Sequence, residues 1–205
     1  MNRPQIMELD HIVVTCRDLD EGAAWLEERL GIAPGPGGRH ALMGTHNRLL
    51  SLGPDCYLEV IAPDPEAPDP GRPRWFDLDR RTAPALTDWV VRVDDLGAAL
   101  AAAPEGVGEA TALERGDLRW RMGVTADGRT PLGGAHPMVL QWDGPGAAGR
   151  LADAGCRLAS LTVETPEAET LHAALPLDDP RIRVVAAPAL RLSAEIDTPH
   201  GRRTL

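Results

Sequence analysis

The segment Leu9-Asp10-His11-Ile12-Val13-Val14 has a counterpart downstream in Thr87-Asp88-Trp89-Val90-Val91. Both segments run on to an Asp-Leu pair, Asp18-Leu19 in the first and Asp95-Leu96 in the second, and then to an alanine-rich stretch. A pattern that recurs along a chain predicts repeated units that bury their faces against one another. The chain is therefore predicted to be internally duplicated, and the duplication decides which residues can meet.

Each copy is predicted to fold as a strand, a helix and then three strands. The β-branched run from His11 to Thr15 predicts the first strand, and Asp18 followed by Glu21 has the form of a helix capping box. Gly31 marks the place where the chain leaves this helix. The three strands of the first copy are expected at residues 39–43, 47–52 and 56–61.

The second copy repeats this order after a crossover. The stretch from 62 to 73 contains five prolines among acidic residues, a composition that stays extended and cannot continue a sheet interior. The second copy is then expected as strands 88–93, 108–114, 118–124 and 138–142 and a helix 96–103. A third segment begins the pattern again, with strands at 159–164, 182–187 and 190–196 and a helix at 167–175.

Composition limits the class of protein. With 205 residues, 43% of them hydrophobic, the chain is expected to be a globular protein with a substantial core. Its net charge of -10 disfavours nucleic acids and anionic membranes as partners. All 21 basic residues are arginine, which we interpret as codon bias of a GC-rich bacterial genome.

Cysteine usage and hydropathy bear on the compartment. The three cysteines are widely spaced and include no CxxC pair, so a disulfide framework is not expected. The first eight residues contain no apolar signal region, and no run of about 18 apolar residues occurs that could span a membrane. We therefore expect a cytoplasmic protein.

Two polar residues stand in apolar strands and are the first candidates for a site. Strand side chains alternate, so His11 faces the same way as Val13, and Glu59 shares a face with Tyr57 and Ile61. If the first and last strands of a copy line one concave surface, His11 and Glu59 converge. An imidazole and a carboxylate are ligands of the kind that Zn, Fe, Mn or Ni sites use.

The sequence resembles the vicinal oxygen chelate superfamily, and more closely its glyoxalase-like domain branch. The main matches are the segments 9–14 and 57–61, and residues 38–40, 44–47 and 119–120 also look like that branch. The resemblance implies an α+β fold in which paired βαβββ modules form a cup-shaped mixed sheet with helices outside. The expected modules are residues 1–63 and 86–145, joined by a proline-rich linker at 64–85, with a partial third βαββ module at 146–205.

The resemblance also implies a site in the cup, where members of the superfamily often hold a divalent metal that binds adjacent oxygens of a small molecule. His11 and Glu59 fall on the ligand positions of the first module, and the second module offers Gln141 and Asp88. Gln141 is therefore a candidate ligand, although a neutral amide oxygen is a weak one. Glu59 and His46 are the candidate catalytic bases. The candidate contacts for a small-molecule substrate are His40, Asn47, Tyr57 and Trp120.

Two readings of function follow from these residues. In the first, the protein is a metal-dependent lyase, isomerase or dioxygenase that acts on a small molecule with adjacent oxygens. In the second, the cup binds or sequesters a small molecule without turnover, and His11 and Glu59 are a hydrogen-bonded pair in a degenerate metal site. A homodimer is expected in either case as the assembly most typical of such modules.

Overall fold

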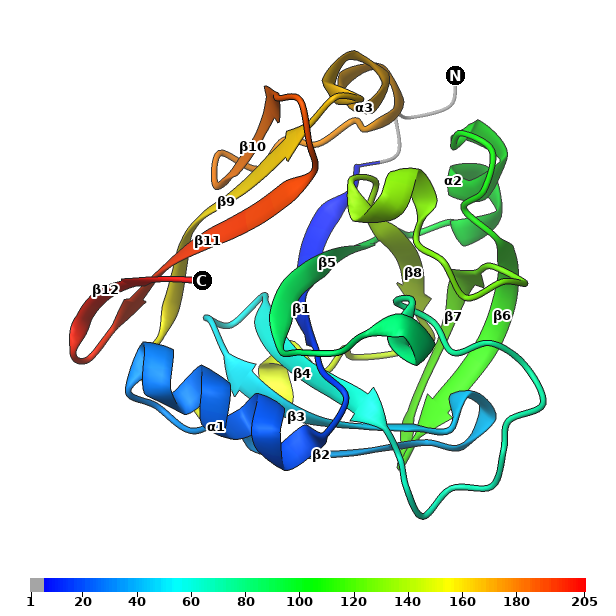
Figure 1. The fold of residues 1–205 in the computed structure, drawn as a ribbon. Coiled ribbons are helices and arrows are strands. Elements are labelled where there is room, and N and C mark those ends of the chain that lie inside the picture. Colours follow the sequence, from blue (N-terminus) through cyan, green and yellow to red (C-terminus); the bar gives the residue numbers. More distant parts are fainter. Residues whose placement is uncertain (1–5) are drawn as a thin grey trace.

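The computed structural model describes residues 6–205 as two β-sheets with three α-helices (Figure 1). The larger sheet has eight strands in the order β2-β3-β4-β1-β5-β8-β7-β6. The smaller sheet has four strands in the order β10-β9-β11-β12 and forms a separate layer. Among the described residues, no helix is long and apolar enough to cross a membrane.

The strands and helices follow the predicted order closely. The first module comprises β1 (Glu8–Thr15), α1 (Leu19–Leu30), β2 (Gly35–His40), β3 (Thr45–Ser51) and β4 (Tyr57–Pro63). The second comprises β5 (Ala85–Arg92), α2 (Leu96–Ala102), β6 (Glu109–Arg115), β7 (Leu118–Val124) and β8 (Met138–Trp142). The C-terminal segment comprises β9 (Arg157–Thr165), α3 (Ala168–Ala174), β10 (Ile182–Ala186), β11 (Arg191–Thr198) and β12 (Gly201–Thr204).

The two modules join through their first strands, which pair antiparallel at the centre of the large sheet. His11 lies opposite Val90, and Asp88 lies opposite Val13, as expected if His11 and Asp88 are equivalent positions of a duplication. In each module the last strand runs parallel to the first, β4 beside β1 and β8 beside β5. The sheet curls so far that its two end strands, β2 and β6, contact one another. The predicted cup of paired βαβββ modules is confirmed.

Both module helices begin at the predicted aspartates. The Asp18 carboxylate accepts a hydrogen bond from the Glu21 amide, and the Asp95 carboxylate accepts one from the Ala98 amide. These side chains satisfy amides that have no partner inside the helix. Gly31 ends α1 with a φ of 72°, a left-handed conformation that glycine adopts without a Cβ clash.

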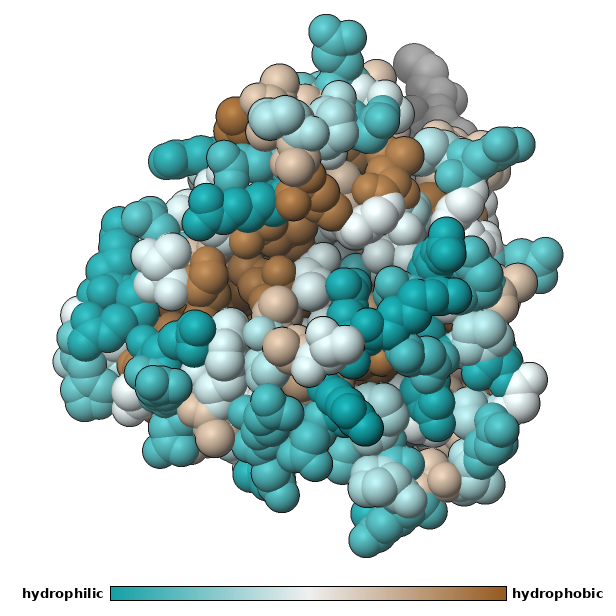
Figure 2. All heavy atoms as spheres, in the orientation of Figure 1, coloured by the Kyte–Doolittle hydropathy of each residue, from teal (hydrophilic) through white to brown (hydrophobic). Residues whose placement is uncertain are grey.

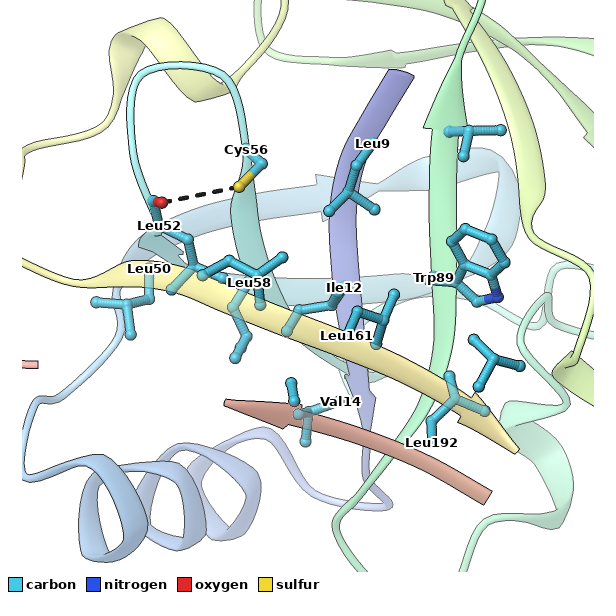
Figure 3. Close-up of a cluster of buried hydrophobic side chains, with 14 of the residues drawn as sticks. Leu9, Ile12, Val14, Leu50, Leu52, Cys56, Leu58, Trp89, Leu161 and Leu192 are labelled. Carbon is cyan, nitrogen blue, oxygen red and sulfur yellow. Dashed lines mark hydrogen bonds between the residues drawn. The ribbon is translucent and has the colours of Figure 1, made fainter. Parts of the chain in front are cut away.

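Strand alternation divides the core between the two faces of the large sheet. Ile12 and Val14 of β1 pack on the convex face, whereas His11 and Val13 face the concave side. Figure 3 shows Ile12 and Val14 beneath Leu161 of β9 and Leu192 of β11, so the small sheet covers the convex face. Figure 2 shows hydrophobic side chains at the junction of the two sheets, among hydrophilic ones.

Three segments differ from the predicted elements. Residues 41–43 form a 3-10 turn instead of strand, because Gly44 takes a left-handed conformation with a φ of 58°. Helix α3 begins after Glu167, and the Thr165 hydroxyl accepts from the Glu167 amide before the first helical turn. The strand β12 was not predicted, and it joins β9, β10 and β11 in a sheet separate from the large one.

The proline-rich linker also departs from an extended crossover. Trp75, Phe76 and Leu78 are buried, and a short 3-10 turn covers Leu78–Arg80. These three apolar side chains join the core on the concave side of the large sheet. The linker therefore supplies part of the wall of the cup.

Candidate functional site

The concave face of the large sheet encloses a small cavity of about 20 Å³, which has room for about one water molecule. The chain has only seven aromatic residues, five Trp, one Tyr and one Phe, and five of them line this cavity. Its walls come from β1, β2, β4, β6, β7, β8 and the linker, through His11, His40, Tyr57, Glu59, Trp75, Phe76, Arg115, Trp120, Met122, Leu140 and Trp142. This concentration of scarce aromatic side chains marks the cavity as the candidate site.

The structure brings His11 and Glu59 together. Strands β1 and β4 are parallel neighbours, with Val13 beside Glu59 and His11 beside Tyr57. The His11 Nε2 atom lies 3.4 Å from a carboxylate oxygen of Glu59, and the His11 ring stacks on Tyr57 with centroids 4.5 Å apart. On the other side, Nδ1 of His11 lies 2.7 Å from a carboxylate oxygen of Asp10. The imidazole is thus held between two carboxylates.

Each carboxylate is fixed by a further neutral donor. The Asn47 side-chain amide donates to Glu59, and the Gly38 backbone amide donates to the Asn47 carbonyl oxygen at 2.8 Å. The Trp142 indole donates to the second oxygen of Asp10 at 2.8 Å. Buried carboxylates are tolerated when their lone pairs are satisfied in this way. The arrangement therefore has little freedom to rotate.

These contacts set the charge of the pair. Burial alone lowers the pKa of His11, but hydrogen bonds and charges from Asp10 and Glu59 outweigh burial and raise it to about 9. Burial raises the pKa of Glu59, and the hydrogen bond and charge of His11 outweigh it and hold that pKa well below its usual range. At neutral pH the cavity therefore contains an imidazolium facing a carboxylate.

His40 lines the same cavity, but its pKa is lowered and not raised. Burial lowers its pKa to about 4, so the ring is neutral at neutral pH. Its Nδ1 lies 3.0 Å from the Thr45 hydroxyl, and its ring meets Trp75 and Trp120 edge to face. A neutral imidazole among aromatic rings contributes shape and one hydrogen-bonding nitrogen, not charge.

Comparison with known proteins identifies the fold. The glyoxalase-like domain family matches residues 9–177. The chain belongs to this family. The match confirms membership of the vicinal oxygen chelate superfamily that the segments around His11 and Glu59 imply. No curated protein gives a significant match to this glyoxalase-like chain.

Two solved structures illustrate the likeness. A hypothetical protein from Staphylococcus aureus has a TM-score of 0.62 and 12% identity, and the alignment covers 92% of this glyoxalase-like protein and 88% of that chain. Methylmalonyl-CoA epimerase from Mycobacterium tuberculosis has a TM-score of 0.43 and 22% identity, with 69% and 91% covered. The likeness to the Staphylococcus aureus protein concerns the fold alone, and the site of the glyoxalase-like protein must be argued from its own residues.

Two predicted site residues lie away from the cavity, and a third, Asn47, contacts Glu59 without lining the cavity. The Gln141 side chain accepts a hydrogen bond from the Leu96 amide at the start of α2, and it borders an outer groove. On β8 the side chains that face the cavity are those of Leu140 and Trp142. His46 borders another outer groove beside α1, because it precedes the inward-facing Asn47. The structure therefore joins neither residue to the His11 and Glu59 pair.

The metal expected for the superfamily can be tested against the donors present. The 3.4 Å between His11 and Glu59 suits two ligands of one ion with bonds of about 2.1 Å. Catalytic zinc sites use three protein ligands, however, and no group of three or more His, Cys, Asp or Glu within residues 6–205 could hold a metal. Asp88, equivalent to His11 in the second module, lies 3.5 Å from Arg81 and does not line the cavity. The donor set of this glyoxalase-like protein does not fit a resident divalent ion.

Several wall residues were not predicted from the sequence. Trp142 lines the cavity and donates to Asp10, which does not itself line the cavity but contacts Nδ1 of His11. Trp75 and Phe76 reach the cavity from the linker, and Arg115 reaches it from the end of β6. The adjacent aromatic pair in a proline-rich acidic segment was the one available signal, because such residues are rarely left in solvent.

Proposed function

We propose that this glyoxalase-like protein is an enzyme that moves a proton on a small carbonyl compound bound between His11 and Glu59. The observation that carries the proposal is a buried pair of His11 and Glu59, 3.4 Å apart, that opens onto an aromatic cavity. Strongly shifted pKa values in a cavity are typical of acid and base catalysts. A protein that only packed these side chains would gain as much from apolar residues of similar size.

The two residues divide the work by charge. The His11 Nε2 proton donates to the carbonyl oxygen of the substrate, while Asp10 keeps hold of Nδ1. Glu59 then loses its imidazolium partner, so its pKa rises and it can accept a proton from the carbon next to the carbonyl. The negative charge passes to the carbonyl oxygen as an enolate, which His11 stabilises.

Return of the proton from Glu59 completes the reaction. Delivery to the former carbonyl carbon, after proton transfer between the oxygens of an enediol, moves the carbonyl group of a substrate that carries a hydroxyl on the neighbouring carbon. Delivery to the original carbon from the same face restores the substrate. The isomerisation conserves atoms and electrons and needs no redox partner. Asn47 holds Glu59 in place during these steps through its amide.

Entry of a substrate requires the cavity to open. The space is about 20 Å³, so any molecule larger than water displaces part of the wall. Trp75 and Phe76 belong to the linker and not to a strand, which makes this segment the wall most able to move.

The second candidate function is binding without turnover. It is favoured by the five aromatic side chains of the wall, which suit a small apolar molecule. Under this reading Glu59 is a structural partner of His11, and a substitution that keeps its shape leaves ligand binding unaffected.

The test is exchange of carbon-bound protons in D₂O, followed by NMR. The probes are small carbonyl compounds of different charge, namely dihydroxyacetone, methylglyoxal and pyruvate. We expect the wild type to accelerate exchange of at least one probe, and Glu59→Gln to abolish the acceleration while His172→Gln, at an exposed position of α3, retains it. Binding of a probe with no acceleration of exchange would favour the second candidate, and equal exchange by Glu59→Gln would overturn the role of Glu59.

The same protein preparation tests the metal. Elemental analysis without chelator, with titrations of Zn, Fe, Mn and Ni, is expected to show no stoichiometric ion and no increase in melting temperature. A tightly bound ion that is lost in His11→Gln would contradict the donor argument.

A further inference from the structure

Arg115 lies where the two end strands of the large sheet, β2 and β6, meet. It is the last residue of β6, and β6 contacts β2, the strand at the other end of the sheet. The side chain of Arg115 passes over Gly38 of β2, where an added Cβ would lie 2.8 Å from its Cγ and Cδ atoms. Glycine at position 38 therefore leaves the room that this arginine occupies.

Arg115 borders two spaces at this seam. On the inner side it lines the cavity with His11 and Glu59, and on the outer side it lines a groove of about 320 Å³. The groove is formed by β2, by the turn after Arg115 and by residues 147–151. The half-buried guanidinium thus lies between the outer groove and the acid and base pair.

The other arginines of the groove are already paired, but Arg115 is not. Arg39 forms ion pairs with Glu66 and with Asp64, and Arg150 lies 2.6 Å from Asp117. Within the described part of the chain, Arg115 makes no salt bridge and no side-chain hydrogen bond. A half-buried guanidinium with five free donors is suited to a carboxylate, which it can bind in a planar, bidentate geometry.

A second donor of the same cavity also lacks a partner. The indole nitrogen of Trp75 is buried, and no hydrogen-bond acceptor reaches it among residues 6–205. Buried N–H groups are nearly always satisfied in native proteins, so an unpaired one on a side chain that lines a cavity is a donor available to a molecule bound there. Arg115 and Trp75 lie on different segments, so the two observations are independent.

We propose that Arg115 and Trp75 bind the carboxylate of a small oxo acid that enters at the seam between β2 and β6. The inference deepens the proposed function, on which it rests for the carbonyl group, by naming the substrate class. A single carboxylate fits better than a dianion, because Asp10 and Glu59, one at each ring nitrogen of His11, already place two negative charges beside it. The net charge of -10 also disfavours highly charged anions.

The experiment measures equilibrium binding by calorimetry at constant ionic strength. The probes are pyruvate, 2-oxobutyrate and acetoacetate, with uncharged pyruvamide as the matched compound. We expect saturable binding of at least one acid, affinity for that acid reduced about tenfold or more in Arg115→Gln, and weak pyruvamide binding that this substitution does not change. Arg150→Gln changes the same charge in the same groove at a paired residue, and it should bind the acid as the wild type does.

A second variant guards against misfolding and tests the second donor. Trp75→Phe keeps an aromatic ring, removes the N–H and makes the side chain smaller, so it should weaken acid binding with little change in the circular dichroism spectrum. Unchanged affinity in Arg115→Gln, equal affinity for pyruvate and pyruvamide, or no binding of any of the three acids would overturn the proposal. Because binding is read without turnover, loss of proton exchange with intact Arg115-dependent binding would refute the proposed function alone.

Discussion

The charge state of His11 makes stability depend on pH in a defined direction. Its pKa is about 9 in the folded protein and about 6.5 in an unfolded chain, a difference of about 2.5 units. At about 1.36 kcal/mol for each unit, protonated His11 contributes about 3 kcal/mol to the free energy of unfolding. Because the folded pKa is the higher one, this contribution is complete below pH 6.5 and is lost as pH rises through 9.

The measurement is urea unfolding of the wild type and of His11→Gln from pH 6 to 9.5. The difference in unfolding free energy between the two proteins should shrink by about 3 kcal/mol across this range. Taking the difference removes the contribution of Cys16 and Cys56, whose buried thiols have pKa values raised to about 12 and about 11 and titrate in both proteins. NMR of the His11 ring should show its titration well above pH 6.5.

A control and a refutation follow from the same geometry. His172→Gln replaces an exposed histidine of α3 and should leave the pH dependence of the wild type unchanged. If the difference between wild type and His11→Gln is constant from pH 6 to 9.5, His11 is not an imidazolium held by Asp10 and Glu59. This result would also contradict the role of His11 as the acid in the proposed reaction.

Three further substitutions test the cavity wall, the backbone that holds Asn47, and the buried Asp88. Trp75→Ala removes a buried ring and should lower the unfolding free energy by about 3–5 kcal/mol while enlarging the cavity, measured by urea unfolding and xenon binding. Gly37→Ala would place a Cβ 2.2 Å from the Asn47 side-chain oxygen, so it should lower the unfolding free energy by about 1–3 kcal/mol and reduce proton exchange. Gly35→Ala meets no atom closer than 3.5 Å and should lower the unfolding free energy little. Burial raises the pKa of Asp88 to about 6, so its ionised form is unfavourable above that pH, and Asp88→Asn should raise the unfolding free energy at pH 7.5 by up to about 3 kcal/mol.

Each of these has a clear contrary result. A small loss in Trp75→Ala, below about 1 kcal/mol, would mean that the linker does not pack into the cup. Equal effects of the two glycine substitutions would remove the argument that Asn47 is held by a close backbone approach. A loss of stability in Asp88→Asn would show that its ion pair with Arg81 outweighs the cost of burial.

Local patterns in the sequence were sufficient for the modules and for the first pair of site residues. The helix caps at Asp18 and Asp95 depend on hydrogen bonds within four residues, and strand faces depend on a period of two. His11 and Glu59 share the concave face because their strands are parallel neighbours in a duplicated module. These features are local or follow directly from the repeat, so the spacing of residues in the sequence was enough to predict them.

The rest of the cavity was decided by long-range packing. Alternation on β8 shows that Gln141 and Trp142 face opposite ways, but only the assembled sheet decides that Trp142 faces inward and Gln141 outward to α2. Trp75 and Arg115 reach His11 because the linker folds back and the sheet curls until β2 meets β6. Nothing within a few residues of either side chain encodes that closure, since it depends on burying apolar surface between segments far apart in the chain. The sequence by itself therefore determined that His11 and Glu59 share one concave face, and tertiary structure alone decided what surrounds them.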